Sequence, residues 1–157
     1  MTSPYTPPNA QLADPPRPEF SWRTTWIAAS AGTGTAYLLA MTLSPVIQHY
    51  FARGMSNIGE VYQIMFASAG FNLLSLLLSA VGYAYGGILA ATLAPMRAIT
   101  HAVYAGGICM LIDAIGLLGV FPSPLPAWTL AIGFLMTIPC FLGGASWQLK
   151  KASTGTA

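Results

Sequence analysis

Asp113 is the acidic residue with the most unusual setting in this sequence, because it stands well inside a long hydrophobic run. An ionised carboxylate within a membrane span is costly unless a partner stabilises it, and such a residue is a candidate for binding a proton, an ion or a ligand. A structural interpretation is also open. A protonated Asp113, or one hydrogen-bonded by Ser79 and Ser75, would hold two helices together without any further role.

Glu60 and Arg53 form the second group of charged residues that could do chemistry. They lie a few residues apart near the start of the second hydrophobic run. An exposed ion pair there would contribute only about 0 to 1 kcal/mol, as is typical of solvated loop charges. The alternative is that Glu60, Arg53 and Asp113 line one polar vestibule that opens outward and are ligand or proton candidates together.

The histidines and cysteines lack the spacing of a metal or haem site. His49 follows the first hydrophobic run and His101 begins the third, so the expected topology puts them on opposite membrane faces, each solvated at an interface. Cys109 and Cys140 lie in hydrophobic runs without CxxC or Cys/His spacing, which indicates structural thiols rather than metal ligands or a disulfide. We predict no metal site and no cofactor.

No catalytic motif is found in the sequence. The Gly-Thr-Gly-Thr stretch at 32–35 lies within a hydrophobic run and lacks the lysine of a phosphate-binding loop. The GxSxG, HExxH and paired-acid patterns are absent as well. We therefore predict no catalytic residue and no enzyme activity. Four tyrosines could form an aromatic cage, but we expect them to pack or to anchor helices at the interface: Tyr62, Tyr83, Tyr85 and Tyr104.

The composition requires a membrane to position these residues. Only 6% of the 157 residues are charged and 55% are hydrophobic, which is too few charges to coat a soluble globule of this size. The net charge is +2, but Lys and Arg do not cluster on one face as nucleic-acid binding requires. We therefore do not expect the chain to bind nucleic acid. The lipid bilayer is the expected surrounding of most of the chain.

Four segments are long and apolar enough to cross the membrane, for which about 20 residues suffice. They lie near 25–47, 62–93, 98–120 and 127–148. The second is longer than required, so its first turns project from the membrane or the helix is tilted. Short links between the later segments favour antiparallel neighbours. The predicted fold is all-α and integral to the membrane, an antiparallel four-transmembrane-helix bundle over 25–149.

The two ends of the chain are expected in the cytoplasm. Residues 1–24 are proline-rich and predict a disordered tail, because proline lacks a backbone donor and has a fixed φ. Residues 150–157 form a second, short tail. Most basic residues fall on one side of this topology, which leaves Arg53 alone on the other and favours N-in/C-in by the positive-inside rule: Arg17, Arg23, Arg97, Lys150 and Lys151.

The first residues resemble a known pattern. SPYTPPNAQLADPP is similar to the NPYxPPxAxL opening of many small, mostly uncharacterised bacterial inner-membrane proteins, with Ser3 in place of the usual Asn. The matching positions cover about a tenth of the chain: Pro4, Tyr5, Pro7, Pro8, Ala10 and Leu12. The resemblance implies a bacterial inner-membrane setting.

Small and polar residues at alternating spacings of three and four predict where the helices pack, since close approach and interhelical hydrogen bonds hold membrane helices together. The second span carries Ser68, Asn72, Ser75, Ser79, Gly82 and Gly86. The third carries Ala102, Gly106, Cys109, Asp113 and Gly116. These two stripes are the predicted packing seam, with Asp113 level with Ser79. The fourth span carries Gly133, Thr137, Cys140 and Gly144, with a kink expected at Pro139.

These features favour a non-catalytic inner-membrane protein that binds another membrane protein or a second copy of itself. An accessory subunit of a larger complex and an immunity protein against a membrane-active toxin are two forms of this hypothesis. The alternative is a small transporter or channel subunit in which Asp113 changes its protonation or binds a cation. A third possibility is an enzyme subunit that holds a quinone or a lipid.

Overall fold

The computed structural model describes residues 19–51, 57–118 and 125–154, and this part of the chain is helical with no strand. Outside the described residues lie positions 1–18, which make up most of the expected N-terminal tail, as well as Arg53 and the link at 119–124. The elements follow in the order α1 (Trp22–Phe51), α2 (Ile58–Ala67), α3 (Ala69–Leu93), the 3-10 turn η1 (Pro95–Arg97), α4 (Ala98–Leu117) and α5 (Ala127–Thr154).

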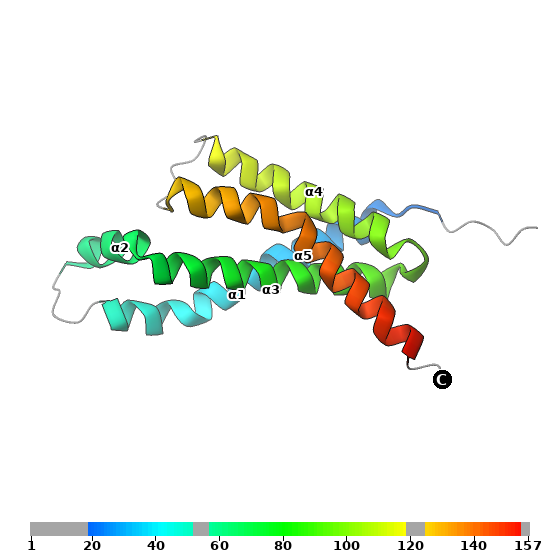
Figure 1. Ribbon diagram of the computed structural model, residues 1–157, viewed down its shortest axis with the longest axis horizontal. Coiled ribbons are helices and arrows are strands. Elements are labelled where there is room, and N and C mark those ends of the chain that lie inside the picture. Colours follow the sequence, from blue (N-terminus) through cyan, green and yellow to red (C-terminus); the bar gives the residue numbers. More distant parts are fainter. Residues whose placement is uncertain (1–18, 52–56, 119–124, 155–157) are drawn as a thin grey trace, which may run out of the picture.

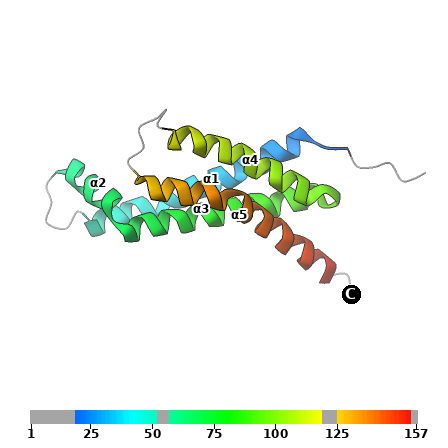
Figure 2. The same cartoon turned by 45° about the horizontal axis from the view of Figure 1, so that its top comes forward.

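The long helices α1, α3, α4 and α5 lie alongside one another and alternate in direction (Figure 1). The start of α1, the α3–α4 turn and the end of α5 share one end of the molecule, and α2 lies at the other end in both views (Figures 1 and 2). The core between them is rich in alanine, which lets the helix backbones approach closely. Its fully buried members include Ala28, Ala90, Ala102, Ala105, Phe141 and Ala145.

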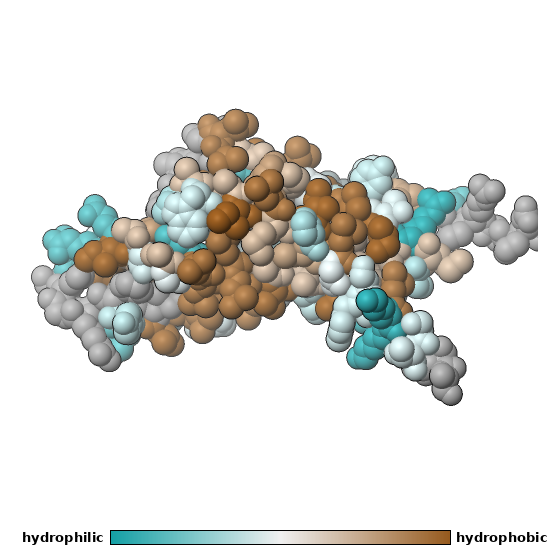
Figure 3. Space-filling view, viewed as in Figure 1, coloured by the Kyte–Doolittle hydropathy of each residue, from teal (hydrophilic) through white to brown (hydrophobic). Residues whose placement is uncertain are grey.

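Within the described ranges, three helices are apolar and long enough to cross a membrane: Ala69–Leu93, Pro95–Ile115 and Ala127–Thr154. The 25 residues of α3 alone give a length of about 37 Å, more than the hydrocarbon layer requires. Hydrophobic residues cover most of the middle of the face in Figure 3, and hydrophilic residues gather towards its two ends. These features support a multi-pass membrane protein.

The expected second span over 62–93 is wrong as a single helix. The chain breaks at Ser68, whose extended backbone (φ −72°, ψ 122°) ends α2 and begins α3. The Ser68 hydroxyl accepts the N–H of Phe71 at 3.5 Å, and the Asn72 side-chain amide donates to the carbonyls of Phe66 (2.9 Å) and Ser68 (3.0 Å). These bonds satisfy backbone groups that the break frees, as a helix cap does.

The small-residue stripe of α3 packs against helices other than the expected one. We predicted that α3 and α4 form the tightest pair, but α3 packs more extensively against α5 and α1 than against α4. A Cβ added to Gly82 would lie 2.6 Å from the Cβ of Ala36, and one added to Gly86 would lie 2.7 Å from the carbonyl oxygen of Ala28, both in α1. A stripe of small residues marks a buried face, but it does not identify the neighbour that covers it.

The crossing of α3 and α5 brings two backbones into direct contact. A Cβ on Gly87 would overlap the carbonyl of Phe141, and a Cβ on Gly144 would overlap the carbonyl of Ala84. The Phe141 ring is fully buried beside this crossing and stacks on Tyr83 at 5.7 Å between ring centroids. Glycine at these two positions is therefore required by space.

α5 bends near its middle and its last turns diverge from the other helices (Figure 1). Pro139 lies inside α5, where it removes one backbone N–H donor, the usual cause of a sharp bend. The helix continues to Thr154, so the first residues of the expected 150–157 tail are helical. Similarly, α1 begins at Trp22, within the expected 1–24 tail.

Candidate functional site at Asp113

Asp113 lies in the last two turns of α4 and is tied to two neighbouring helices. The Tyr83 hydroxyl in α3 donates to its Oδ2 at 3.1 Å, with Oδ1 at 3.5 Å. The Thr137 hydroxyl in α5 lies 3.1 Å from the same Oδ2. Three helices therefore meet at this one carboxyl group.

The Tyr83 hydroxyl donates fully to the carboxylate, but the Thr137 hydroxyl does not. The Thr137 hydroxyl also faces the Gly133 carbonyl at 2.9 Å, and a hydroxyl has a single proton to share between these two acceptors. No basic side chain pairs with Asp113 among the described residues. The negative charge of an ionised Asp113 is thus stabilised by dipoles and has no counter-charge in this part of the protein.

A cavity of about 210 Å³ opens beside Asp113 between α3, α4 and α5. Apolar side chains form most of its wall, including Leu76, Leu130 and Phe134. Its polar lining groups are the side chains of Ser75, Ser79, Tyr83, Asp113 and Thr129. We call this space the Asp113 cavity.

Thr129 is a buried polar residue of the Asp113 cavity whose side chain lacks a partner. It is 3% exposed, and its Oγ1 makes no hydrogen bond in the structure. A buried hydroxyl without a partner costs roughly 1 to 3 kcal/mol, so an unpaired one beside a cavity is a position where a bound molecule gains a contact.

The expected partners of Asp113 were Ser79 and Ser75. Both line the Asp113 cavity, but the hydrogen bonds to the carboxylate come from Tyr83 and Thr137. The level of the pairing agrees with the expectation, because side chains in a helix lean towards its N-terminus and a tyrosine reaches about one turn back. The residue spacing predicted the depth at which α3 meets Asp113, but it did not predict that the longer Tyr83 side chain makes the contact.

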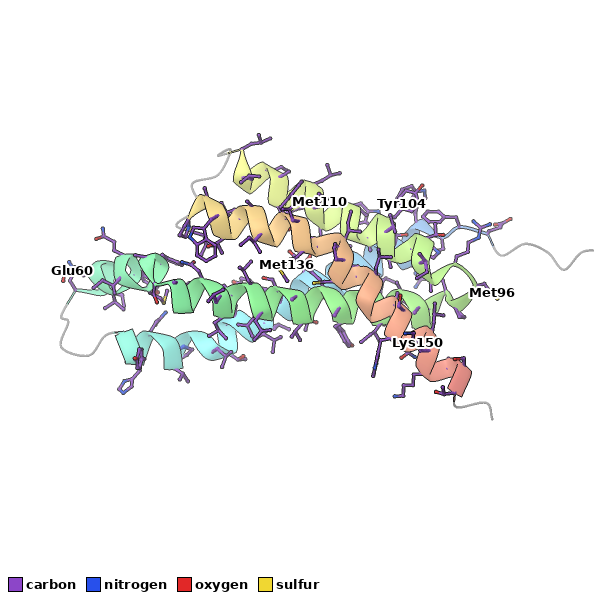
Figure 4. All side chains as sticks on the ribbon, viewed as in Figure 1. Glu60, Met96, Tyr104, Met110, Met136 and Lys150 are labelled. Carbon is purple, nitrogen blue, oxygen red and sulfur yellow. The ribbon has the colours of Figure 1, made fainter. Side chains whose placement is uncertain are left out.

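The proposed vestibule is not assembled as expected. Glu60 is exposed in the first turn of α2, at one extreme end of the molecule (Figure 4), and is not among the residues that line the Asp113 cavity. Arg53 lies outside the described residues. Asp113 therefore remains as the charged member of the candidate site.

His101 is buried, whereas we expected it to be solvated at an interface. It is 1% exposed, and its Nδ1 is hydrogen-bonded to the Thr25 hydroxyl at 2.9 Å. The Phe20 ring stacks on it at 4.6 Å between centroids, and Trp22 and Tyr104 complete the aromatic group. This cluster fastens the start of α1 to α4, which is a structural role.

The remaining members of the predicted packing seam divide among several neighbours. Ala102 is buried in the core, and a Cβ on Gly106 would lie 3.2 Å from Ile138 of α5. The Cys109 thiol lies 3.3 Å from the Thr33 hydroxyl of α1, and both Cys109 and Cys140 are free. Gly116 lies in α4.

The outer face of α1 carries hydroxyl and glycine residues beside exposed apolar ones such as Leu38 and Met41. We define it by Ser30, Thr33, Gly34 and Tyr37, of which Tyr37 is 60% exposed. A Cβ added to Gly34 would meet no atom within 4 Å. Ser30, Thr33 and Gly34 border a groove of about 250 Å³ between α1 and α4.

No protein-family model, curated protein or solved structure matches the chain. The two features available for assigning a function are the Asp113 cavity and the outer face of α1.

Proposed function

We propose that this chain is a non-catalytic protein of the bacterial inner membrane that acts by binding another membrane protein or a second copy of itself. Its fold is an antiparallel four-transmembrane-helix bundle in which α1 is the fourth span. The three apolar helices support the membrane setting. The observation that carries the binding function is the outer face of α1.

α1 is suited to a protein-covered position in the bilayer. Its 30 residues give a length of about 45 Å, ample for a span. The exposed Ser30 and Thr33 and the half-buried Gly34 make a weaker contact with lipid than leucine or isoleucine would, and small or hydroxyl-bearing residues are those through which membrane helices associate. Ser30 and Gly34 are four residues apart and share one side of the helix. A partner helix laid along this side would approach the α1 backbone closely.

The proposed orientation places both ends in the cytoplasm. Met96 and Lys150 lie towards one end of the molecule and Glu60 at the other (Figure 4). Arg97 and Lys151 belong to the end of Met96 and Lys150, which the positive-inside rule assigns to the cytoplasm. An accessory subunit of a larger complex and an immunity protein against a membrane-active toxin are the two forms of partner binding that fit this arrangement.

A photo-crosslinking residue placed at Ser30 tests the proposal in intact membranes. We expect a covalent adduct, at twice the chain mass for a second copy or at another mass for a different protein. The same residue at Leu135, 67% exposed on α5, is the control and should yield lipid adducts only.

Gly34→Leu should abolish the Ser30 adduct, because a large side chain there blocks close approach of a partner, while its Cβ meets no atom of its own chain within 4 Å. The matched control is Gly143→Leu on α5, where an added Cβ also meets no atom within 4 Å. Absence of any protein adduct from Ser30, or equal adducts in Gly34→Leu and the unsubstituted chain, would contradict this function.

A small transporter or channel subunit is the second candidate, and the Asp113 cavity favours it. A carboxylate without a counter-charge beside an open space is what cation or proton transfer through a membrane requires. Asp113→Asn keeps an oxygen that accepts from Tyr83 and Thr137 but cannot carry the charge. Loss of function in Asp113→Asn with normal membrane insertion would support transport, and full function would support partner binding.

A further inference from the structure

We propose that the Asp113 cavity binds an amphipathic organic monocation, a small alkylammonium or arylammonium. The ammonium group lies against the Asp113 carboxylate, and the hydrocarbon part lies against Leu76, Leu130 and Phe134. The proposal deepens the second candidate function by naming a ligand class. It rests on the Asp113 cavity alone and is independent of the outer face of α1.

The negative charge of the Asp113 carboxylate favours a positively charged ligand. The Asp113 carboxylate has the Tyr83 hydroxyl and a share of the Thr137 hydroxyl, and no basic side chain among the described residues supplies a counter-charge. Charged hydrogen bonds in a water-poor site are among the strongest that proteins form. A bound cation would therefore gain its main contact at this carboxylate.

The hydroxyl groups of the cavity suit a donor with several N–H bonds. The Thr129 Oγ1 is buried, lines the cavity and has no partner, so it is ready to accept a hydrogen bond. Ser79 also lines the cavity and offers a second neutral acceptor. A primary ammonium has three N–H donors, and Asp113, Thr129 and Ser79 give it one charged and two neutral acceptors.

The size and the walls of the cavity favour an organic cation over a metal ion. The volume of about 210 Å³ is several times the roughly 30 Å³ that a single water occupies in the liquid, so a bare alkali ion would leave most of it empty. It is smaller than the pockets of roughly 300 to 1,000 Å³ that hold drug-sized molecules. Apolar walls opposite the carboxylate match a short chain or a single ring.

Calorimetric titration of the full chain in detergent micelles with 2-phenylethylammonium tests the proposal. We expect saturable binding of one molecule per chain, and binding of the uncharged 2-phenylethanol that is weaker by about tenfold or more. Sodium and potassium ions at equal concentration should leave the ammonium affinity unchanged.

Variants locate the site. Asp113→Asn should lower the affinity for 2-phenylethylammonium by about tenfold or more, and Thr129→Val by a smaller factor of about three, because it removes one neutral acceptor. Thr92→Val is the matched control, since Thr92 is an exposed hydroxyl in α3 bonded to its own helix at Ile88. The Thr92→Val variant should bind 2-phenylethylammonium with unchanged affinity.

Three outcomes of these titrations would overturn the proposal. Equal affinity for the ammonium and the alcohol would show a merely apolar cavity, and displacement by sodium ions would show a site for an inorganic cation. Unchanged ammonium affinity in Thr129→Val and in a folded Asp113→Asn would place binding elsewhere. If the chain binds the ammonium but transports nothing, the second candidate function is wrong and the ligand proposal stands. If it transports sodium ions and does not bind the ammonium, the ligand proposal is wrong and the second candidate function stands.

Discussion

The Tyr83 hydroxyl donates a 3.1 Å hydrogen bond to Oδ2 of Asp113, thirty positions further along the chain. The bond joins α3 to α4, two helices whose direct packing is less extensive than that of α3 with α5 or α1. Thr137 adds α5 to the same carboxyl group. Asp113 thus adds a polar contact between α3 and α4, which pack together less extensively than α3 does with α5 or α1.

Tyr83→Phe should destabilise the fold by about 0.6 kcal/mol and at most about 1.7, the range measured for single hydrogen bonds between membrane helices. The ring and its stacking on Phe141 remain, so the change isolates the hydroxyl. The measurement is equilibrium unfolding in mixed detergent micelles. Tyr85→Phe on the exposed side of α3 is the control, and an equal loss in both variants would argue against the Tyr83–Asp113 bond as a stabilising contact.

Gly144→Ala should be severely destabilising, because the new methyl group overlaps the Ala84 carbonyl at the α3–α5 crossing. Overpacking of this kind costs roughly 1 to 3 kcal/mol or more where backbone must move. Gly143→Ala, one residue earlier and open on its outer side, should be neutral or slightly stabilising, since alanine favours helix. Thermal unfolding of the two purified variants provides the comparison, and similar midpoints would refute the close crossing.

Asn72→Leu should loosen α2 without unfolding α3. The substitution removes the amide that donates to the carbonyls of Phe66 and Ser68, and the loss of a cap costs about 0.5 to 2 kcal/mol. Hydrogen exchange followed by mass spectrometry should show faster exchange in 58–67 and unchanged protection in 76–90. Uniform exchange across both segments would indicate a continuous helix instead of the break at Ser68.

Cysteine labelling tests the orientation. On a background in which Cys109 and Cys140 are replaced by alanine, Ser123→Cys should react with a membrane-impermeant maleimide added outside the cell, and Met96→Cys should not. Met96 is 81% exposed, so its lack of labelling would reflect its side of the membrane and not burial. The reverse pattern would invert the proposed topology.

Hydropathy predicted the positions of α4 and α5 well, because a proline-containing link precedes each of these runs. The kink expected at Pro139 lies in a helix that bends. Hydropathy failed at Ser68, because an average over 20 residues is insensitive to one serine hydroxyl and one asparagine amide that make a break favourable. Those two residues were assigned to the packing seam, whereas Asn72 is fully buried and bonds to carbonyls next to the break.

The candidate site was predicted in part. Asp113 could be identified from a lone carboxylate in an apolar run, and its depth from the length of the hairpin. Thr129 could not, because a threonine near the start of a span carries no signal until α3 and α4 define the cavity beside it. Tyr83 was expected only to pack, although a tyrosine in the middle of a span needs a partner for its hydroxyl.

The close contacts of Gly87 with Phe141 and of Gly144 with Ala84 also constrain how the protein is made. Membrane helices insert one after another and then associate, and α5, which carries Gly144, is synthesised after α1, α3 and α4. Until α5 arrives, the backbone of α3 has no neighbour on that side, the Phe141 ring cannot stack on Tyr83, and Thr137 cannot bond to Asp113 of α4. Closure of the α3–α5 crossing therefore waits until α5 has been synthesised, and a nascent chain that stops after α4 would lack the contacts that cover this side of α3.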